Sequence, residues 1–405
     1  MNYLFIHQNF PGQFRHVVRA LASQSEHRVV CVGDAGSLNG RPVIHPNIEL
    51  YAYQARKKKS DTTHPYIAGF EAQIRRGQDV ARFLFGLKQK GFEPDIVVAH
   101  PGWGEALFLR DVFPQAKHIQ YFEFYYRSAG SDVNFDPEFA SSFDDQLKLR
   151  IRNSAQLQAL QACDVGVSPT HWQRGQYPPE YATKINVLHE GVDTLIACPN
   201  PDAEFQVGSQ VFKAGQEIIT YVARNLEPYR GFHMFMRSLP KLLSERPNAQ
   251  VLVVGGDDVS YGRRLPAGQS YRAMYSQQME HNVDWSRVHF LGKLPYSSYL
   301  QVLQVSAVHL YLTYPFVLSW SLLEAMSVGC AVVASNTAPV AEVIKDHEHG
   351  LLFDFFNADD LVKSVCDVLS HPERFTSMLQ LARQSTVERF DLRLVCLPQW
   401  LALFH

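Results

Sequence analysis

The sequence lacks the features that mark a secreted or membrane-spanning protein. Its six cysteines are widely spaced with no Cys-x-x-Cys pair, which argues against a disulfide framework and favours buried thiols in a reducing compartment. No apolar run approaches the roughly 18 residues that a membrane span needs, and the opening MNYLFIHQNFPG lacks the basic region of a signal peptide. These absences predict a cytoplasmic protein that at most touches the inner face of a membrane.

An excess of charge of one sign is also missing. The chain carries 38 Lys and Arg against 40 Asp and Glu, for a net charge of -2, which argues against nucleic-acid binding through a general positive field. What is present is apolar, because 46% of the residues are hydrophobic and 12% are aromatic. A globular chain of 405 residues with this composition is expected to form two large domains.

Short apolar runs alternate with segments of helical spacing along most of the chain. Because the runs are apolar at successive positions, they indicate strands buried on both faces of parallel sheets, connected by helices. A stretch rich in Pro, Gly and polar residues interrupts this βα alternation at residues 197–216. We therefore predict an N-terminal domain at residues 1–200, a second at 201–385, and apolar C-terminal helices at 386–405 that pack back toward the first domain.

Two glycine-containing turns follow expected strands of the first half. In the segment HQNFPGQF, Gly12 would let the backbone approach a ligand, although an ordinary βα turn explains it as well. Gly102 and Gly104 begin a Gly-x-Gly pattern, but Leu107 stands where a dinucleotide fingerprint needs a third glycine. The turn therefore argues against a dehydrogenase.

Two arginines of the second half stand where a strand ends and a helix begins. Arg224 and Arg230, in RNLEPYRG, are placed so that both guanidinium groups could bind one diphosphate. The alternative is a solvated loop in which Glu227 pairs with either arginine.

A helix is expected from about Ser319 to Val328, in the segment SWSLLEAMSV. The backbone amides at its amino end, from Ser319 to Ser321, suit a phosphate, and the carboxylate of Glu324 suits the two hydroxyls of a ribose. Its apolar neighbours make a purely solvated Glu324 a poorer explanation.

Taken together, these motifs resemble the retaining glycosyltransferases of family 4, which have the GT-B fold. The resemblance covers most of residues 186–370, more loosely the first 185, and depends on five motifs: HEGVDT, RNLEPYRG, VVGGDD, VHFLGKLP and LLEAMSVGCAVVAS. It implies an α/β protein of two Rossmann-like, doubly wound domains that face a central cleft.

The resemblance also implies roles for particular residues. Arg224 and Arg230 would bind the donor diphosphate, Glu324 the ribose, and the backbone around Lys293 and Leu294 the base. The implied donor site as a whole comprises Gly12, Arg224, Arg230, Lys293, Leu294, Ser319, Trp320, Ser321 and Glu324.

Two positions depart from the family pattern. Where the family commonly has a glutamate that contacts the donor sugar, this chain has Phe316, so sugar recognition does not carry over. The family's active-site histidine corresponds to Glu123, and His100, one strand earlier, is the other candidate for that role. A structural alternative for Glu123 is an ion pair with Arg127, and for His100 a hydrogen-bonded packing role.

Neither a metal motif nor a cofactor motif is evident. The chain has no Asp-x-Asp, and the cluster at residues 346–349 is expected to be a solvated turn. Without a metal, the two arginines and the helix dipole would have to stabilise the leaving diphosphate. The basic run at residues 56–59 and the amphipathic segment at 74–91 suit either a solvated surface or contact with anionic lipid.

The sequence therefore predicts a metal-independent, retaining glycosyltransferase without a cofactor. Its donor would be a nucleotide diphosphate sugar, and its acceptor a hydroxyl of a glycan, a lipid-linked sugar or a small molecule, with polysaccharide or glycolipid biosynthesis as the setting. Glu123, His100, Arg224 and Arg230 are the candidate catalytic residues. The alternative, suggested by Phe316 and Glu123, is a non-catalytic sugar-nucleotide-binding partner of another transferase.

Overall fold

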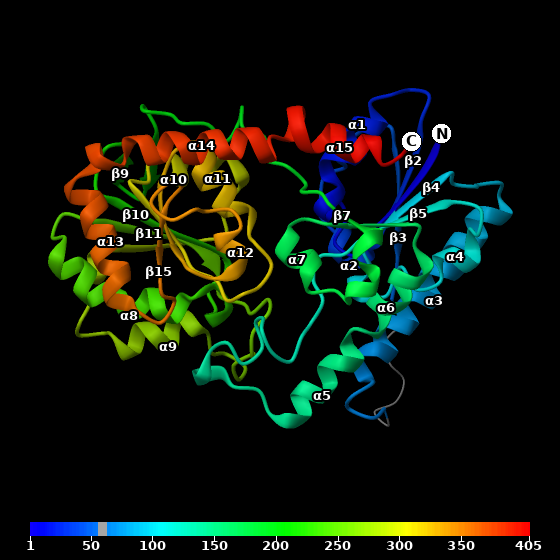
Figure 1. Cartoon of the computed structure of the whole chain (residues 1–405), viewed down its shortest axis with the longest axis horizontal. Helices are drawn as coiled ribbons and strands as arrows, with labels where there is room; N and C mark the ends of the chain where they lie inside the picture. The colour runs from blue at the N-terminus through cyan, green and yellow to red at the C-terminus, as the bar shows by residue number, and fades with distance from the viewer. Residues whose placement is uncertain (56–62) are drawn as a thin grey trace. The chain divides into compact units, whose positions relative to one another are not determined.

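The computed structural model describes residues 1–55 and 63–405, so the basic run at 56–59 lies outside the described residues. The chain forms two compact units, one comprising residues 1–190 and 396–405 and the other residues 191–395. Each unit has a parallel sheet with helices packed beside it (Figure 1). Two Rossmann-like α/β domains are therefore present, which confirms the predicted fold class.

The first unit is built on a seven-stranded parallel sheet with strand order β3-β2-β1-β4-β5-β6-β7. Its strands are β1 (Asn2–Ile6), β2 (Arg28–Asp34), β3 (Ile48–Tyr53), β4 (Ile96–Ala99), β5 (Lys117–Tyr121), β6 (Val165–Ser168) and β7 (Ile185–Val187). The helices are α1 (Arg15–Ala22), α2 (Ala35–Leu38), α3 (Ala68–Gln89), α4 (Leu109–Val112), α5 (Phe143–Arg152), α6 (Ser154–Ala162), α7 (His171–Gly175) and α15 (Leu397–Ala402). Short 3-10 turns are η1 (Gly12–Phe14), η2 (Pro101–Trp103), η3 (Pro137–Phe139) and η4 (Pro179–Lys184).

The central strand of this sheet explains why its sequence is continuously apolar. Phe5 of β1 packs in one hydrophobic cluster with Val29 and Val98, whereas Leu4 packs in a second cluster with Val30. Successive side chains of a strand point to opposite faces, so both faces of the sheet are buried.

The second unit has a six-stranded parallel sheet with strand order β12-β11-β10-β13-β14-β15. Its strands are β10 (Ile218–Asn225), β11 (Gln250–Gly256), β12 (Val288–Gly292), β13 (Val308–Tyr311), β14 (Ala331–Ser335) and β15 (Leu351–Phe353), and β8 (Glu204–Val207) pairs with β9 (Gln210–Lys213) as an antiparallel hairpin. The helices are α8 (Phe232–Glu245), α9 (Tyr271–Gln278), α10 (Tyr296–Gln304), α11 (Trp320–Val328), α12 (Ala338–Ala341), α13 (Ala358–Ser370) and α14 (Thr376–Phe390). The 3-10 turns η5 (Pro228–Arg230), η6 (Trp285–Arg287) and η7 (Pro372–Phe375) complete it, and a π-helical segment at Leu392–Cys396 ends at the first residue of the C-terminal part of the first unit.

The C-terminal segment is divided between the units at a different point from the one expected. Helix α14 belongs to the second unit, and only residues 396–405 join the first. There α15 lies beside α1 (Figure 1), and the indole N–H of Trp400 donates to the carbonyl oxygen of His189 at 3.2 Å. Phe404 packs edge-on against Tyr3, so the end of the chain completes the core of the first unit.

Within the described residues, no helix is long and apolar enough to cross a membrane. All six cysteines are free thiols, in agreement with the absence of a disulfide framework.

Candidate functional site

Three polar side chains of the first unit meet where neighbouring strands end. His7 follows β1, His100 follows β4, and Glu123 lies two residues beyond β5. Strands β1, β4 and β5 are adjacent and parallel, so their carboxyl ends lie at one edge of the sheet, where ligands of doubly wound folds bind. The rings of His7 and His100 are 5.2 Å apart between centroids, and His100 Nε2 lies 3.5 Å from Glu123 Oε2. The structure thus brings the candidate residues His100 and Glu123 together.

The tautomer of neutral His100 is set by the backbone. Its Nδ1 accepts a hydrogen bond from the backbone N–H of Gly102 at 3.1 Å, so the ring proton is on Nε2. That Nε2 is buried and has no hydrogen-bond partner among the described residues. Trp103 stacks on the ring with centroids 4.4 Å apart. A buried N–H without a partner costs free energy, and a ligand oxygen placed there would remove that cost.

Glu123 is held from two directions and does not form the expected ion pair. Its Oε1 accepts from the amide nitrogen of Gln13 at 2.7 Å, and its backbone carbonyl accepts from Gln173 at 2.6 Å. Arg127 is exposed, and the described residues contain no ion pair between it and Glu123. The structural alternative based on Arg127 is therefore wrong. The Glu123 side chain is 30% exposed, which leaves it accessible to a ligand.

Gly12 is needed for the packing of His7. Its φ of +49° lies in the left-handed region, and a Cβ atom there would come within 2.4 Å of His7 Nε2. The immediate neighbour of Gly12 is this histidine ring, and the predicted role of Gly12 at the donor stays a prediction.

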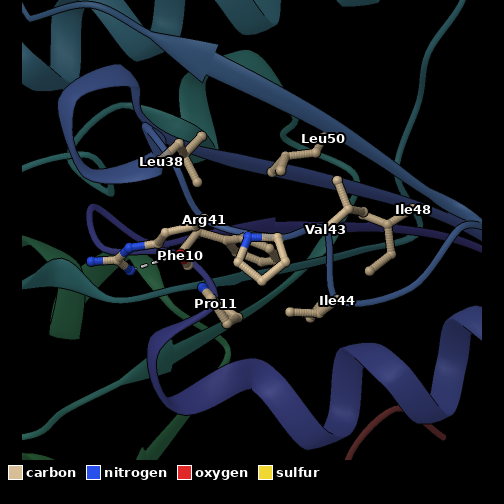
Figure 2. Close-up of a pocket in the computed structure, with 9 residues that line it drawn as sticks. Phe10, Pro11, Leu38, Arg41, Val43, Ile44, Ile48 and Leu50 are labelled. Carbon is tan, nitrogen blue, oxygen red and sulfur yellow. Dashed lines mark hydrogen bonds between the residues drawn. The ribbon is translucent and has the colours of Figure 1, made fainter. Parts of the chain in front are cut away.

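An apolar recess lies beside the first βα turn (Figure 2). Arg41 at this recess donates from Nη1 to the backbone oxygens of Asn9 and Phe10, at 3.0 and 3.2 Å, and so holds the turn that leads to Gly12. The recess is lined by Phe10, Pro11, Leu38, Arg41, Pro42, Val43, Ile44, Ile48 and Leu50.

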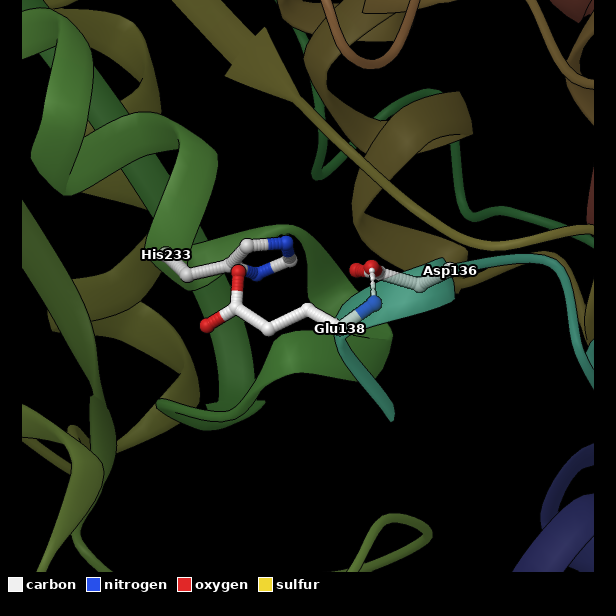
Figure 3. A group of neighbouring side chains, drawn as sticks. All are labelled: Asp136, Glu138 and His233. Atoms are coloured by element: carbon white, nitrogen blue, oxygen red, sulfur yellow. Dashed lines mark hydrogen bonds between the residues drawn. The ribbon is translucent and has the colours of Figure 1, made fainter. Parts of the chain in front are cut away.

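Two acidic residues of the first unit have clear structural roles. Asp136 caps η3, because its carboxylate accepts from the backbone N–H of Glu138 at 2.9 Å (Figure 3). Glu105 is fully buried and accepts from the hydroxyl of Tyr53 at 2.5 Å, with Arg76 Nε 3.7 Å from the same oxygen. Burial raises the pKa of Glu105 above its ordinary value. Neither residue stands in one of the motifs that the sequence offers.

In the second unit, Arg230 is a buried cation with neutral partners. It is 7% exposed, and its Nη1 donates to Thr313 Oγ1 at 3.0 Å and to the carbonyl oxygen of Val317 at 2.9 Å. Its guanidinium carbon lies 5.4 Å from the ring centroid of Tyr261. No carboxylate forms an ion pair with Arg230 among the described residues, although a buried charge is costly unless it is paired. The site therefore suits an anion.

Glu227 does not pair with the arginines, as the alternative for this loop required. Its fully buried carboxylate accepts three backbone N–H groups, from Ser260 at 2.9 Å, Tyr261 at 3.1 Å and Gly262 at 2.8 Å. These bonds fix the loop that carries Tyr261 over Arg230. The pairing expected from closeness in sequence is wrong, because three amide donors 33 to 35 residues away satisfy the carboxylate instead.

The remaining cations of the predicted donor site are exposed. Arg224 is next to the last residue of β10 and forms no hydrogen bond or ion pair within the described residues. Lys293 Nζ lies 3.6 Å from Asp258, with both side chains more than half exposed, and Leu294 packs against the hydrophobic cluster around β8 and β9. Exposed charges of this kind interact weakly with a ligand compared with the buried Arg230.

Glu324 is buried on α11 and hydrogen-bonded at both carboxylate oxygens. The hydroxyl of Tyr296 donates to Oε1 at 2.8 Å, and that of Tyr299 donates to Oε2 at 2.6 Å. Burial is the main cause that raises the pKa of Glu324, while the tyrosine hydrogen bonds lower it. Each carboxylate oxygen can accept a further hydrogen bond, so the arrangement leaves acceptor capacity for ligand hydroxyls.

The amino end of α11 begins where the sequence predicts it. Ser319 caps the helix by accepting from the N–H of Ser321, and its own N–H donates to the hydroxyl of Tyr311 at 2.8 Å. Trp320, the first helical residue, is 47% exposed, whereas Ser321 is buried.

Phe316 occupies an aromatic cluster instead of offering a polar group. It is 3% exposed, with its ring centroid 4.9 Å from Tyr261 and 5.4 Å from Tyr229. Its ring also lies 5.8 Å from the guanidinium carbon of Arg230. His233 of α8, drawn in Figure 3, packs beside the same cluster, edge-on to Tyr314. Because Phe316 stands where the family commonly has a glutamate, one side of the Arg230 guanidinium faces an aromatic ring and not a carboxylate.

Family models match both units of the chain. Residues 25–196 match the glycosyl transferase family 4 group, and residues 202–385 match the glycosyl transferases group 1. The chain belongs to the group 1 glycosyltransferases, the family to which the sequence motifs pointed, with the GT-B fold.

Two curated relatives are similar over about half of the chain. Spore coat protein SA of Bacillus subtilis is 22% identical over 227 residues, which are 52% of this chain and 56% of that protein. A GDP-mannose-dependent alpha-(1-6)-phosphatidylinositol monomannoside mannosyltransferase of Mycolicibacterium smegmatis is 23% identical over 251 residues, 57% of this chain and 59% of that protein.

Solved structures share the fold over the whole chain. A sucrose-phosphate synthase of Thermosynechococcus elongatus superimposes with a TM-score of 0.76 at 19% identity, covering 100% of this chain and 98% of its own. HepE of Anabaena in complex with UDP and glucose gives a TM-score of 0.69 at 16% identity, with the same coverage.

Proposed function

We propose that the chain is a retaining glycosyltransferase that moves a sugar from a nucleotide diphosphate sugar to a hydroxyl group of an acceptor. The observation that carries the proposal is the buried Arg230, whose guanidinium has neutral hydrogen-bond partners but no carboxylate among the described residues. A diphosphate would supply the missing negative charge and form charge-assisted hydrogen bonds with it.

The second unit would bind the donor. Arg230 and the exposed Arg224 would hold the diphosphate, together with the backbone amides at the start of α11 from Ser319 to Ser321. Glu324 would accept from the ribose hydroxyls with the acceptor capacity that its two tyrosine partners leave free. The backbone near Lys293 and Leu294 would meet the base.

The first unit would bind the acceptor hydroxyl. The N–H at His100 Nε2 can donate to the hydroxyl oxygen, and Glu123 Oε2, 3.5 Å away, can accept a hydrogen bond from the same hydroxyl and so orient it. One hydroxyl group can satisfy both at once, because it has one donor and two acceptor sites. This pairing supports the assignment of His100 and Glu123 to the reacting group.

In the proposed reaction, the bond between the anomeric carbon and the diphosphate oxygen breaks, and a bond from that carbon to the acceptor oxygen forms on the same face. The departing diphosphate oxygen takes the acceptor proton, and Arg224 and Arg230 stabilise the negative charge that develops on it. The resemblance to retaining enzymes supports retention of configuration.

We further propose that no metal or cofactor takes part. The sequence has no Asp-x-Asp, and a buried guanidinium can neutralise the leaving group in place of a divalent cation. Activity is expected to survive EDTA. Complete loss of activity that Mg²⁺ or Mn²⁺ restores would contradict this part of the proposal.

For the acceptor we propose a glycan, a lipid-linked sugar or a small molecule, in polysaccharide or glycolipid biosynthesis. The mannosyltransferase relative, whose name includes phosphatidylinositol monomannoside, supports the glycolipid option. An intracellular enzyme that works at the inner face of a membrane would suit such an acceptor.

The decisive experiment is transfer or donor hydrolysis by the purified chain alone. Thermal shift against UDP-, GDP- and ADP-sugars would first identify the nucleotide, because a ligand at 100 times its dissociation constant adds about 2.7 kcal/mol of stability. UDP-glucose and GDP-mannose are the first choices, since similar proteins bind or use them. Binding without any turnover would favour the alternative, a non-catalytic sugar-nucleotide-binding partner, which the aromatic Phe316 suggests.

A further inference from the structure

Gln13 connects two of the strand-end residues of the first unit, although the proposed reaction does not use it. It lies in η1, directly after Gly12, and its side-chain oxygen is 2.8 Å from His7 Nε2. Its amide nitrogen is 2.7 Å from Glu123 Oε1, across 110 residues of sequence. The side chains of His7, Gln13 and Glu123 therefore form one continuous hydrogen-bond network.

The direction of each hydrogen bond in this network follows from a backbone N–H that donates to His7. His7 Nδ1 accepts from the backbone N–H of Asn9 at 2.9 Å, so neutral His7 carries its proton on Nε2. Burial, and then the nearby His100, hold the pKa of His7 well below its ordinary value, which keeps the ring neutral. Nε2 must then donate to the oxygen of Gln13, and this fixes which end of the amide faces Glu123.

The same arrangement is repeated one strand away. His100, like His7, accepts at Nδ1 from the amide two residues later and carries its proton on Nε2. His7 Nε2 donates to the side-chain oxygen of Gln13. The N–H at His100 Nε2 has no hydrogen-bond partner among the described residues and lies 3.5 Å from Glu123 Oε2. The two oxygens of Glu123 are thereby distinguished, since Oε1 accepts from Gln13 and Oε2 faces His100.

We propose that Gln13 is a positioning residue for the acceptor-side pair. By donating to Glu123 Oε1, it fixes the orientation of the carboxylate so that Oε2 and the N–H of His100 present one acceptor and one donor to the same hydroxyl. Its own orientation is fixed by His7. This inference rests on the proposed function, in which Glu123 and His100 bind the reacting hydroxyl.

The test compares Gln13→Met, which removes both hydrogen bonds at nearly constant side-chain length, with the wild-type chain. Turnover per folded molecule should fall about 10- to 100-fold, as expected for one hydrogen bond to a charged group. Affinity for the nucleoside diphosphate, measured by calorimetry, should stay unchanged, because Arg224, Arg230 and Glu324, which the proposed function assigns to that ligand, lie in the second unit. Gln13→Glu should lose more turnover than Gln13→Met, because it places two carboxylates side by side.

A matched control is available in the second unit. Gln250, the first residue of β11, has its side-chain oxygen 3.0 Å from His289 Nε2, so it repeats the Gln–His pair at the amino end of a strand. Gln250→Met should lower the melting temperature to a degree similar to Gln13→Met and leave turnover per folded molecule intact. A parallel loss of turnover in both variants would overturn the positioning role.

A double variant separates orientation from stability. In Gln13→Glu with Glu123→Gln, the new amide at position 123 can donate to the new carboxylate at position 13, which still accepts from His7. The melting temperature should recover relative to Gln13→Glu alone, while turnover stays low because position 123 no longer carries a carboxylate.

The outcomes distinguish this inference from the proposed function. If Glu123→Gln alone leaves turnover unchanged, the proposed role of Glu123 is wrong and the positioning role is wrong with it. If Glu123→Gln lowers turnover but Gln13→Met and Gln13→Glu do not, only the inference about Gln13 is overturned.

Discussion

The polar groups at the strand ends of the two units are satisfied in opposite ways. In the first unit, neutral His7 donates to the amide oxygen of Gln13, and the amide nitrogen of Gln13 donates to the Glu123 carboxylate. The main group without a partner there is the N–H of His100. In the second unit, the buried Arg230 keeps a full positive charge among neutral partners. The first arrangement suits a neutral hydroxyl, and the second suits an anion.

This difference in charge explains how similar α/β units can serve two ligands. Both sheets are parallel and place polar side chains at the carboxyl ends of their strands. The ligand that each one suits depends on the groups presented to it, which are a carboxylate oxygen beside a neutral N–H in the first unit and a buried cation in the second.

The largest effect is expected at Glu123. Glu123→Gln should lower turnover by roughly 10²-fold or more, the range of a positioned acid or base, because it removes the acceptor at Oε2. Fold and nucleotide affinity should be kept. Steady-state rates and calorimetry on the same preparation measure the two quantities.

Arg127→Ala is the control for this experiment. Arg127 is exposed and forms no ion pair with Glu123 in the described residues, so its removal should change neither turnover nor melting temperature measurably. If Glu123→Gln keeps the wild-type turnover, the proposal that the first unit binds the reacting hydroxyl through Glu123 is wrong.

The next effect is expected at Arg230. Arg230→Ala should cost at least about 2 kcal/mol in kcat/KM, and Arg224→Ala less, because only Arg230 is shielded from solvent. Arg230→Lys should be the mildest change at this position, since it keeps the charge and can still donate to Thr313 and Val317.

Arg230→Met gives a sharper version of this test. Replacing a buried, unpaired charge by an apolar side chain of similar length is often neutral or stabilising. Without ligand, the melting temperature of this variant should therefore be equal to or higher than that of the wild-type chain, while affinity for nucleoside diphosphate is lost. A large drop in melting temperature with affinity retained would show that the cation serves the fold and not an anion.

The sequence allowed the strands and both sheets to be predicted, whereas the roles of the candidate site residues stay predictions. Segments that are apolar at successive positions clearly indicate buried strands. Residues that follow such strands, such as His100 and Arg230, are therefore expected near the carboxyl edge of the sheet, where ligands of doubly wound folds bind. Partners distant in sequence could not be predicted: Gln13 meets Glu123 across 110 residues, and Glu227 takes amides 33 to 35 residues away. Pairings guessed from closeness in sequence, Glu123 with Arg127 and Glu227 with the arginines, were wrong for this reason.

A moderate effect is expected at Glu324. Glu324→Ala should weaken binding of the free nucleoside diphosphate about tenfold, as expected for the loss of hydrogen bonds to a charged acceptor. The control is Glu388→Ala, an exposed glutamate of α14 whose side chain accepts from Gln384. Unchanged affinity in Glu324→Ala would contradict the ribose role and leave Arg230 as the main donor contact.

The smallest effect is a pH dependence of stability in the second unit. Burial raises the pKa of Glu324 above its ordinary value, so the folded chain holds this proton more tightly than the unfolded chain does. The resulting stabilisation is fully present below the unfolded pKa, about 4.3 for a glutamate, and is lost as pH rises through the folded pKa. Glu324→Gln keeps a neutral side chain at every pH and lacks this dependence. Melting curves of both proteins without nucleotide, from pH 4 to 8, should show the wild-type melting temperature falling relative to the variant by about a few degrees. Parallel curves would mean that the hydrogen bonds from Tyr296 and Tyr299 fully offset the effect of burial on the pKa of Glu324. If the melting temperature of the wild-type chain instead rises with pH relative to the variant, those hydrogen bonds lower the pKa by more than burial raises it.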